Sequence, residues 1–166
     1  APAITIIGSS ANRAGIWLGQ GNGDSSPPGT VLIQSSATSG GGISLEGSSS
    51  QTSGGHRGIA LWGNATNGFQ TYQFLSNNGP IEFWSRIDSA NSEIGIWSDT
   101  YLGQRKDSTS IQGVTPIAGS ANVVSVFRAD KGVYFSDSVY GSGSVEVYPL
   151  TSGQSIGVEY AGDIEV

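Results

Sequence analysis

The 166-residue sequence contains no cysteine and only one histidine, His56. Without cysteine no disulfide can form, so a domain with a thin core must be stabilised in another way, and oligomerisation is the first candidate. A catalytic triad or a histidine-based metal site needs partners that the chain does not offer. We interpret His56, which lies in the glycine-rich segment 54–58, as a solvent-facing turn residue. The sequence therefore predicts no metal ion and no cofactor.

Charge is also scarce. Charged residues make up 12% of the chain, the net charge is −6 and the sequence pI is about 4.5. Nucleic-acid binding is not expected, because no basic stripe is present to neutralise phosphates. Arg105 and Lys106 are the only adjacent cations, and a solvated turn accounts for them. No run of 18 apolar residues occurs, so no membrane insertion is expected.

Glycine and aromatic residues are plentiful. The 26 glycines, together with many serines, threonines and asparagines, are typical of disordered chains. Fifteen aromatic residues spread over the whole length argue against disorder, because disordered segments contain few large apolar groups. The composition favours an all-β protein of short strands and many turns.

A glycine-led hydrophobic segment recurs along the chain, at intervals of 43, 37 and 37 residues between its glycines. The four copies are Gly15-Ile16-Trp17-Leu18, Gly58-Ile59-Ala60-Leu61-Trp62, Gly95-Ile96-Trp97 and Gly132-Val133-Tyr134-Phe135. A period of this length indicates stacked supersecondary units. We predict about four quasi-repeats of 37–43 residues: three in a β-repeat region, residues 1–113, and a divergent fourth in a C-terminal β region, residues 114–166.

Three short strands are expected in each unit. The predicted ranges are 3–7, 15–19 and 30–35; 43–46, 58–63 and 69–75; 81–87, 94–97 and 109–114; and 122–128, 132–136 and 144–149, followed by 155–160 and 163–166. Alternation of apolar and polar residues, as in Val145-Glu146-Val147-Tyr148, indicates antiparallel sheet with one drier face. No window has a sustained helical period. The expected architecture is fibre-like, prism-like or sandwich-like.

The acidic residues do not form a recognisable catalytic motif. A pair of carboxylates can hydrolyse a glycosidic bond without histidine, but the 13 acids are scattered. No local spacing places two of them on one face beside aromatic residues, and Glu82 near Trp84 comes nearest to such an arrangement. The segment 19–24, Gly-Gln-Gly-Asn-Gly-Asp, lacks the lysine of a P-loop and the terminal glutamate of a calcium loop. We predict no catalytic residues, and the chain is not expected to be an enzyme.

The tryptophans are the remaining candidates for a binding site. Trp17, Trp62 and Trp97 occupy nearly repeating positions, and Trp84 lies in a predicted strand. Exposed indole rings beside polar groups form shallow sugar-binding sites. Aromatic residues that recur with a repeat also stack along a shared interior, and this second interpretation is favoured. The four tryptophans are therefore predicted as ligand-binding residues only if they face solvent.

Most of the chain resembles the shaft and tip modules of tailed-bacteriophage tail fibres and tailspikes. The resemblance rests on short strands, Gly/Ser/Asn turns, low charge and segments such as Gly58–Asn64 and Gly79–Trp84. It implies a homotrimer with a common core, a place in the virion, and contacts with other virion proteins and with a host-surface glycan or protein. The implied function is host attachment by a viral structural protein.

Three other functions remain open. A capsid decoration or cement protein would also be a trimer of β-structure. A carbohydrate-binding, lectin-like module would have a β-prism or propeller arrangement. A polysaccharide depolymerase would need a carboxylate pair brought together by the fold.

Overall fold

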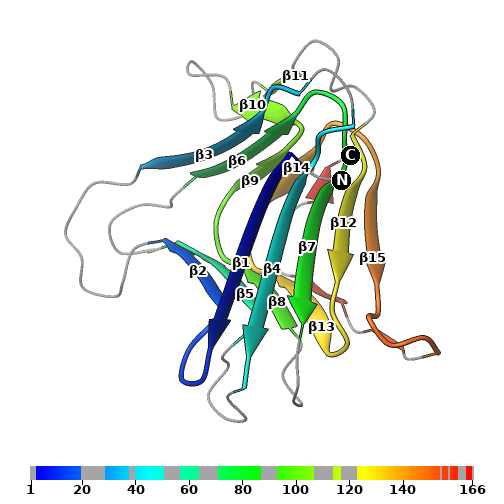
Figure 1. Cartoon of the computed structure of the whole chain (residues 1–166). Helices are drawn as coiled ribbons and strands as arrows, with labels where there is room; N and C mark the ends of the chain where they lie inside the picture. Colours follow the sequence, from blue (N-terminus) through cyan, green and yellow to red (C-terminus); the bar gives the residue numbers. More distant parts are fainter. Residues whose placement is uncertain are drawn as a thin grey trace.

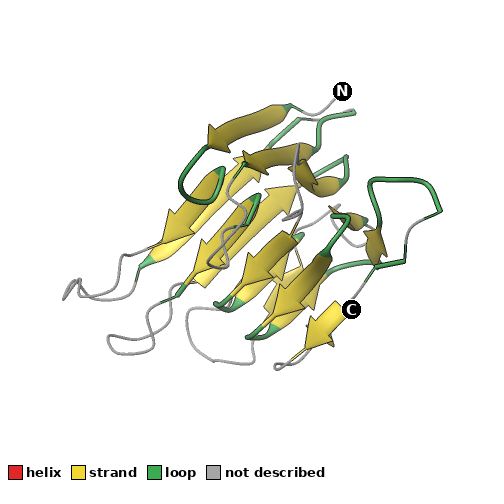
Figure 2. Cartoon of the chain, turned by 90° about the horizontal axis from the view of Figure 1, so that it is seen from below, coloured by secondary structure: helices red, strands yellow, loops and turns green. Residues whose placement is uncertain are grey.

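The structure, a computed structural model, consists of β-strands joined by turns and loops, and the residues that it describes contain no helix (Figure 2). The described residues are 3–19, 29–37, 40–50, 57–63, 71–86, 93–106, 114–116, 123–153, 155–156, 158–160 and 164–165. The all-β fold class predicted from the sequence is confirmed.

Fifteen of the strands form three five-stranded sheets, which we name A, B and C. Sheet A consists of β1 (Ile4–Ser10), β4 (Ile43–Ser49), β7 (Ile81–Arg86), β12 (Ser125–Arg128) and β15 (Val145–Tyr148). Sheet B consists of β2 (Ile16–Gly19), β5 (Ile59–Trp62), β8 (Glu93–Ile96), β13 (Gly132–Phe135) and β16 (Val158–Tyr160). Sheet C consists of β3 (Thr30–Ser35), β6 (Thr71–Ser76), β9 (Thr100–Leu102), β14 (Val139–Gly141) and β17 (Ile164–Glu165).

The chain winds through sheets A, B and C in turn and forms a β-solenoid (Figure 1). Each pass, which we call a rung, adds one strand to every sheet, and neighbouring strands of each sheet pair in parallel. The predicted antiparallel arrangement is therefore wrong. Alternation of apolar and polar residues shows only that one face of a sheet is buried. A parallel sheet with one buried face has the same alternation as an antiparallel one. Among the described residues, only the hairpin of β10 (Gln104–Lys106) and β11 (Val114–Pro116) pairs antiparallel.

The core lies inside the three sheets and is built from rows of aligned apolar residues. One row of sheet A runs Ile6, Leu45, Phe83, Phe127, Val147, and one row of sheet B runs Ile16, Ile59, Ile94, Val133. The members of these rows in the three middle rungs are almost completely buried. The rings of Phe83 and Phe127 stack with centroids 4.8 Å apart. Such in-register stacking buries like residues on like residues from one rung to the next.

The four glycine-led segments lie in sheet B, and Gly15, Gly58 and Gly132 stand at the corner where the chain passes from sheet A to sheet B. The third copy is shifted along its strand, so that Gly95 lies inside β8 and aligns with Ala60 and Tyr134. A Cβ atom on Gly15 would lie 2.4 Å from the backbone nitrogen of Ser48, and one on Gly58 would lie 2.0 Å from the Ser85 hydroxyl oxygen. The corner glycines are thus required because the next rung approaches closely.

Two predicted strands are assigned differently in the structure. The range 144–149, expected as the last strand of the fourth unit, holds β15, which starts a fifth rung in sheet A. The third strand of the fourth rung is β14 instead. In the third rung that place is taken by β9, whereas the predicted range 109–114 lies outside the described residues except for Val114, which begins β11. Only three residues separate β14 from β15, so the sequence does not show that a new rung begins at β15.

The three sheets contain strands from both predicted regions, 1–113 and 114–166. Strands β7, β8 and β9 of the first region pair with β12, β13 and β14 of the second. The division of the chain at residue 113 stays a prediction.

Tyr72 closes the corner between sheets B and C. Its fully buried side chain points inward from β6, and its hydroxyl lies 2.8 Å from the carbonyl oxygen of Leu18 and 2.9 Å from that of Trp62. Both carbonyls stand near the ends of sheet-B strands, where the chain leaves the sheet. Burial raises the pKa of the Tyr72 hydroxyl far above its ordinary value, so the group remains a hydrogen-bond donor.

We predict that Tyr72→Phe destabilises the chain by about 1–3 kcal/mol, because it removes a buried hydroxyl donor that two partly buried carbonyls share. Chemical denaturation followed by tryptophan fluorescence measures the change. Tyr134→Phe is the matched control, since Tyr134 lies on the outer face of sheet B and is partly exposed. Equal stabilities of the two variants would contradict the role given to the Tyr72 hydroxyl.

A second contact ties the turn after β12 to the turn after β15. The Asp130 carboxylate accepts hydrogen bonds from the Thr151 backbone N–H at 2.6 Å and from the Thr151 hydroxyl at 2.8 Å. Partial desolvation raises the pKa of Asp130, but these bonds and one from the Leu150 backbone outweigh it, so the pKa lies below its ordinary value.

Because the folded-state pKa is lowered, Asp130 stabilises the fold above the pKa of the unfolded carboxyl group, and this contribution is lost as the pH falls. We therefore expect Asp130→Asn to lower the melting temperature slightly at neutral pH, and the difference from the unmodified chain to shrink in acid. Thermal unfolding at several pH values tests this. A difference that grows as the pH falls would contradict it.

Candidate functional site

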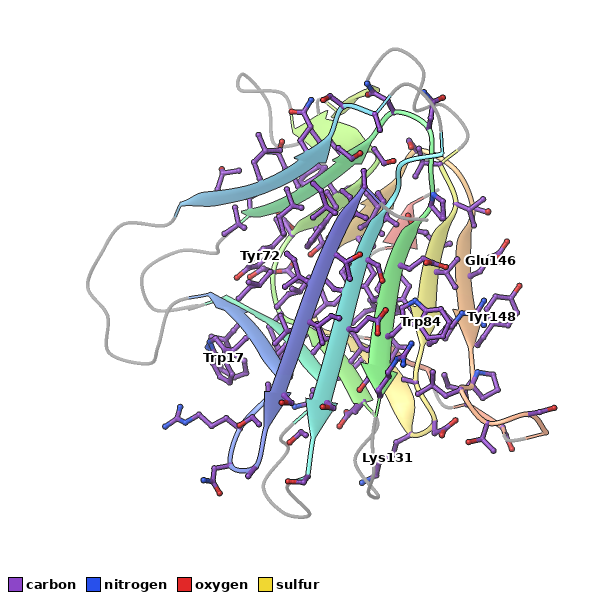
Figure 3. All side chains as sticks on the ribbon, in the orientation of Figure 1. Trp17, Tyr72, Trp84, Lys131, Glu146 and Tyr148 are labelled. Carbon is purple, nitrogen blue, oxygen red and sulfur yellow. The ribbon has the colours of Figure 1, made fainter. Side chains whose placement is uncertain are left out.

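Four aromatic side chains form a continuous row along the outer face of sheet B, one from each of the first four rungs. They are Trp17 on β2, Trp62 at the end of β5, Trp97 just after β8, and Tyr134 on β13. Neighbouring ring centroids are 5.4, 4.7 and 5.7 Å apart along the row. The row therefore follows the axis of the solenoid, and Trp17 stands at its first end (Figure 3).

Strand alternation explains why these rings face outward. In β2 the buried Ile16 precedes Trp17, and in β5 the buried Leu61 precedes Trp62. Successive residues of a strand point to opposite faces, so an indole that follows an inward side chain must lie outside. The favoured interpretation, in which the repeating tryptophans fill a shared interior, is wrong.

Small residues make room for the rings. Ala60 and Gly95 align with Trp17 and Tyr134 across the sheet, so the middle of this aligned set carries almost no side chain. The indole of Trp97 lies over Gly95, where an added Cβ would meet the ring at 2.2 Å. The Trp97 ring thus occupies the space that a side chain at position 95 would fill, between the rings of Trp62 and Tyr134.

The rings cover much of each other's surface. Trp17 and Trp62 are stacked at an interplanar angle of 29°, whereas Trp62 and Trp97 are tilted at 52°. The Arg57 guanidinium lies 4.3 Å from the Trp97 ring centroid and forms an ion pair of 3.0 Å with Glu93. Trp17 is the most open member, with 40% of its surface exposed, because it belongs to the edge strand β2.

Trp84 lies on a different face, the outside of sheet A (Figure 3). The Arg128 guanidinium is placed between two rings, 4.8 Å from Trp84 and 4.9 Å from Tyr148. The Tyr148 hydroxyl donates a hydrogen bond of 2.9 Å to Glu146, which raises the pKa of Tyr148 above its ordinary value. The structure therefore brings three of the four predicted tryptophans together and leaves the fourth in a cation–π cluster.

Tyr134, Arg57 and Glu93 complete the row on sheet B but were missed as candidates. Tyr134 holds the tryptophan position in the fourth glycine-led segment, Gly132-Val133-Tyr134-Phe135, so the repeat itself carried the signal. Arg57 directly precedes Gly58 in the second copy. The partner of Arg57, Glu93, lies in the next rung, and only the register of β5 with β8 brings the two together.

Candidates for catalysis and metal binding find little support in the described part of the chain. Within it, no group of three or more histidine, cysteine, aspartate or glutamate residues is placed to hold a metal ion. Glu82 faces outward beside Ser44 and Val126 in the sheet-A register. His56 and most of the segment 19–24 lie outside the described residues.

A search of the described ranges for a membrane-crossing helix, one long and apolar enough to span a bilayer, found none.

No protein-family model matches the chain, and comparisons with curated proteins and with solved structures give no significant match.

We predict that Gly95→Ala displaces the Trp97 ring and destabilises the chain by roughly 1–3 kcal/mol through overpacking. The same substitution in a Trp97→Ala background should cost much less, because the ring that meets the new methyl group is gone. Chemical denaturation of the two single variants and the double variant gives the coupling energy. Additive effects would show that the ring does not depend on Gly95.

Proposed function

We propose that the chain is a structural module of a virion appendage, of the tail-fibre and tailspike kind, that attaches to a host-surface glycan through the aromatic row of sheet B. The observation that carries the glycan contact is this row of Trp17, Trp62, Trp97 and Tyr134. The proposal that the chain is part of a virion appendage is supported by its resemblance in sequence to tail-fibre and tailspike modules.

The row has the chemistry of a shallow sugar-binding strip. Aromatic rings stack against the apolar C–H face of a sugar, and nearby polar groups bind its hydroxyls. Trp17 offers the largest open ring surface, and Arg57 with Glu93 offers donors and acceptors beside Trp97. An elongated ligand lying along the solenoid axis would meet the rings of successive rungs in turn.

The charges beside the row favour a neutral glycan. The Arg57 guanidinium lies over the rings of Trp97 and Tyr134, and its ion pair with Glu93 neutralises its charge. The chain as a whole is acidic, with a net charge of −6. A polyanionic ligand would gain no compensating attraction there and would be repelled at longer range.

The solenoid provides a rigid support for such a strip. Strands of five rungs are held in register by parallel pairing, and the core rows beneath the aromatic row are fully buried in the middle rungs. A preorganised row costs little conformational entropy on binding. This rigidity fits an appendage that must hold a binding surface away from the particle.

A homotrimer belongs to the same proposal. The chain buries its own core, so a trimer would pack solenoids side by side through their outer faces rather than share one interior. Sedimentation velocity measures this assembly directly. Contacts with other virion proteins are proposed on the same basis.

Binding to neutral surface polysaccharides, measured by quenching of tryptophan fluorescence and by a glycan array, tests the proposed site. We expect Trp17→Ala to weaken binding severalfold, because a stacked aromatic ring contributes on the order of 1 kcal/mol. Trp84→Ala is the matched control: it removes the same side chain from another sheet and should leave affinity unchanged.

Two results would overturn the proposal. Loss of binding in Trp84→Ala with full binding in Trp17→Ala would move the site to sheet A. Failure to bind any glycan on the array, together with no binding of labelled protein to bacterial cells, would remove the attachment function. Labelling of the capsid shell rather than the tail in electron microscopy would favour a decoration protein instead.

A further inference from the structure

One end of the solenoid is an open edge. Strands β1, β2 and β3 are edge strands of sheets A, B and C, so among the described residues each pairs with a neighbouring strand on one side only. The three strands read ITIIGSS, IWLG and TVLIQS and contain no charged residue. We call this surface the N-terminal edge. A free edge without charge is a template for pairing with another strand.

The N-terminal edge is also apolar. Except for Ile16, the inward apolar side chains of the first rung are only partly buried, whereas their counterparts in the next rung, such as Ile43 and Leu45, are fully buried. Those of the first rung are Ile4, Ile6, Leu18, Val31 and Ile33. On the outside, Ile7 is 73% exposed and Leu32 is 48% exposed. Among the described residues, the hydrophobic core is therefore only partly covered at this edge.

The opposite edge differs in charge. Each of its three strands contains a glutamate: Glu146 in β15, Glu159 in β16 and Glu165 in β17. Charged residues on an edge strand are a common device against edge-to-edge pairing. Two copies of this edge would pair strands that are both acidic in sequence, which disfavours their association.

We propose that the N-terminal edge is an interface that pairs with the N-terminal edge of a second copy of this chain. Such a head-to-head contact is isologous and closes after two copies. Head-to-tail stacking would place the acidic strands β15, β16 and β17 of one copy against β1, β2 and β3 of the next, which offer no cation. Head-to-tail stacking would also leave one edge of each assembly free, so that further copies could add and form a filament.

The aromatic row supports the same contact. Trp17 ends the row at β2, and among the described residues its ring stacks on that of Trp62 alone. A partner rung at this edge would cover the remaining ring surface, as each inner ring of the row is already covered. Aromatic contacts of this kind add about 0.5–1.5 kcal/mol each beyond the area that they bury.

The proposal does not depend on host attachment or on a lateral trimer, because pairing of two N-terminal edges doubles the mass of whatever unit carries them. We expect sedimentation velocity of the full chain at micromolar concentration to show a species of twice the unit mass. The double variant Ile7→Lys, Leu32→Lys should halve that mass, because it places cations on both sides of the contact.

Tyr148→Lys is the matched control. Tyr148 is 41% exposed on β15, at the opposite edge of sheet A, so a lysine there adds positive charge far from the N-terminal edge. This variant should keep the doubled mass. Far-UV circular dichroism and thermal unfolding establish that all variants fold.

Net charge gives a second readout. Each copy carries a charge of −6, so added salt should strengthen an apolar head-to-head contact by screening the repulsion between copies. A chain that sediments as a single unit at every concentration and salt level overturns the proposal. So does a doubled mass that survives in the Ile7→Lys, Leu32→Lys variant or disappears in Tyr148→Lys.

Discussion

The structure depends on in-register parallel pairing between rungs. Because each strand of sheet A, B or C pairs with the strand one rung away, a side chain of a middle rung has equivalent positions on both sides of it. Rows that face inward are mostly apolar, as in Leu45, Phe83 and Phe127. The outward-facing aromatic row does not follow a single register position: Trp17 aligns with Ala60, whereas Trp62 aligns with Gly19. The rings meet because these small residues leave room for large side chains from neighbouring rungs.

The sequence predicted the parts of the fold that depend on repetition. The glycine-led segments mark sheet B because the corner at Gly15 and Gly58 has no room for a side chain. Spacing alone does not reveal strand direction, since in the first four rungs a strand's partner lies about 40 positions away and is not its neighbour along the chain. The β14 and β15 strands were misassigned for a related reason: they follow each other closely, and only their pairing with β9 and β12 separates them.

The site was predictable in part. Repetition identified Trp17, Trp62 and Trp97 as a set, but it did not say on which face they lie. Parity along the strand decides this, because Ile16 and Leu61 face the core and the next residue must face away. The alternation of apolar residues in the sequence therefore already implied that these indole rings face solvent. The contact of Arg57 with Glu93 was not predictable, because it needs the register of two strands that are separated by a long connection.

Binding along the side of the solenoid and association at its end use different residues, with one exception. Trp62, Trp97 and Tyr134 lie on the flank of sheet B, whereas Ile7 and Leu32 belong to the N-terminal edge. Trp17 belongs to both surfaces, since it is the end of the aromatic row and a member of an edge strand. A second copy at that edge would cover the most open ring of the row and, in the same step, continue the row into the partner. The two proposals are therefore thermodynamically linked at Trp17, and by linkage any glycan that occupies this ring must change the affinity between copies.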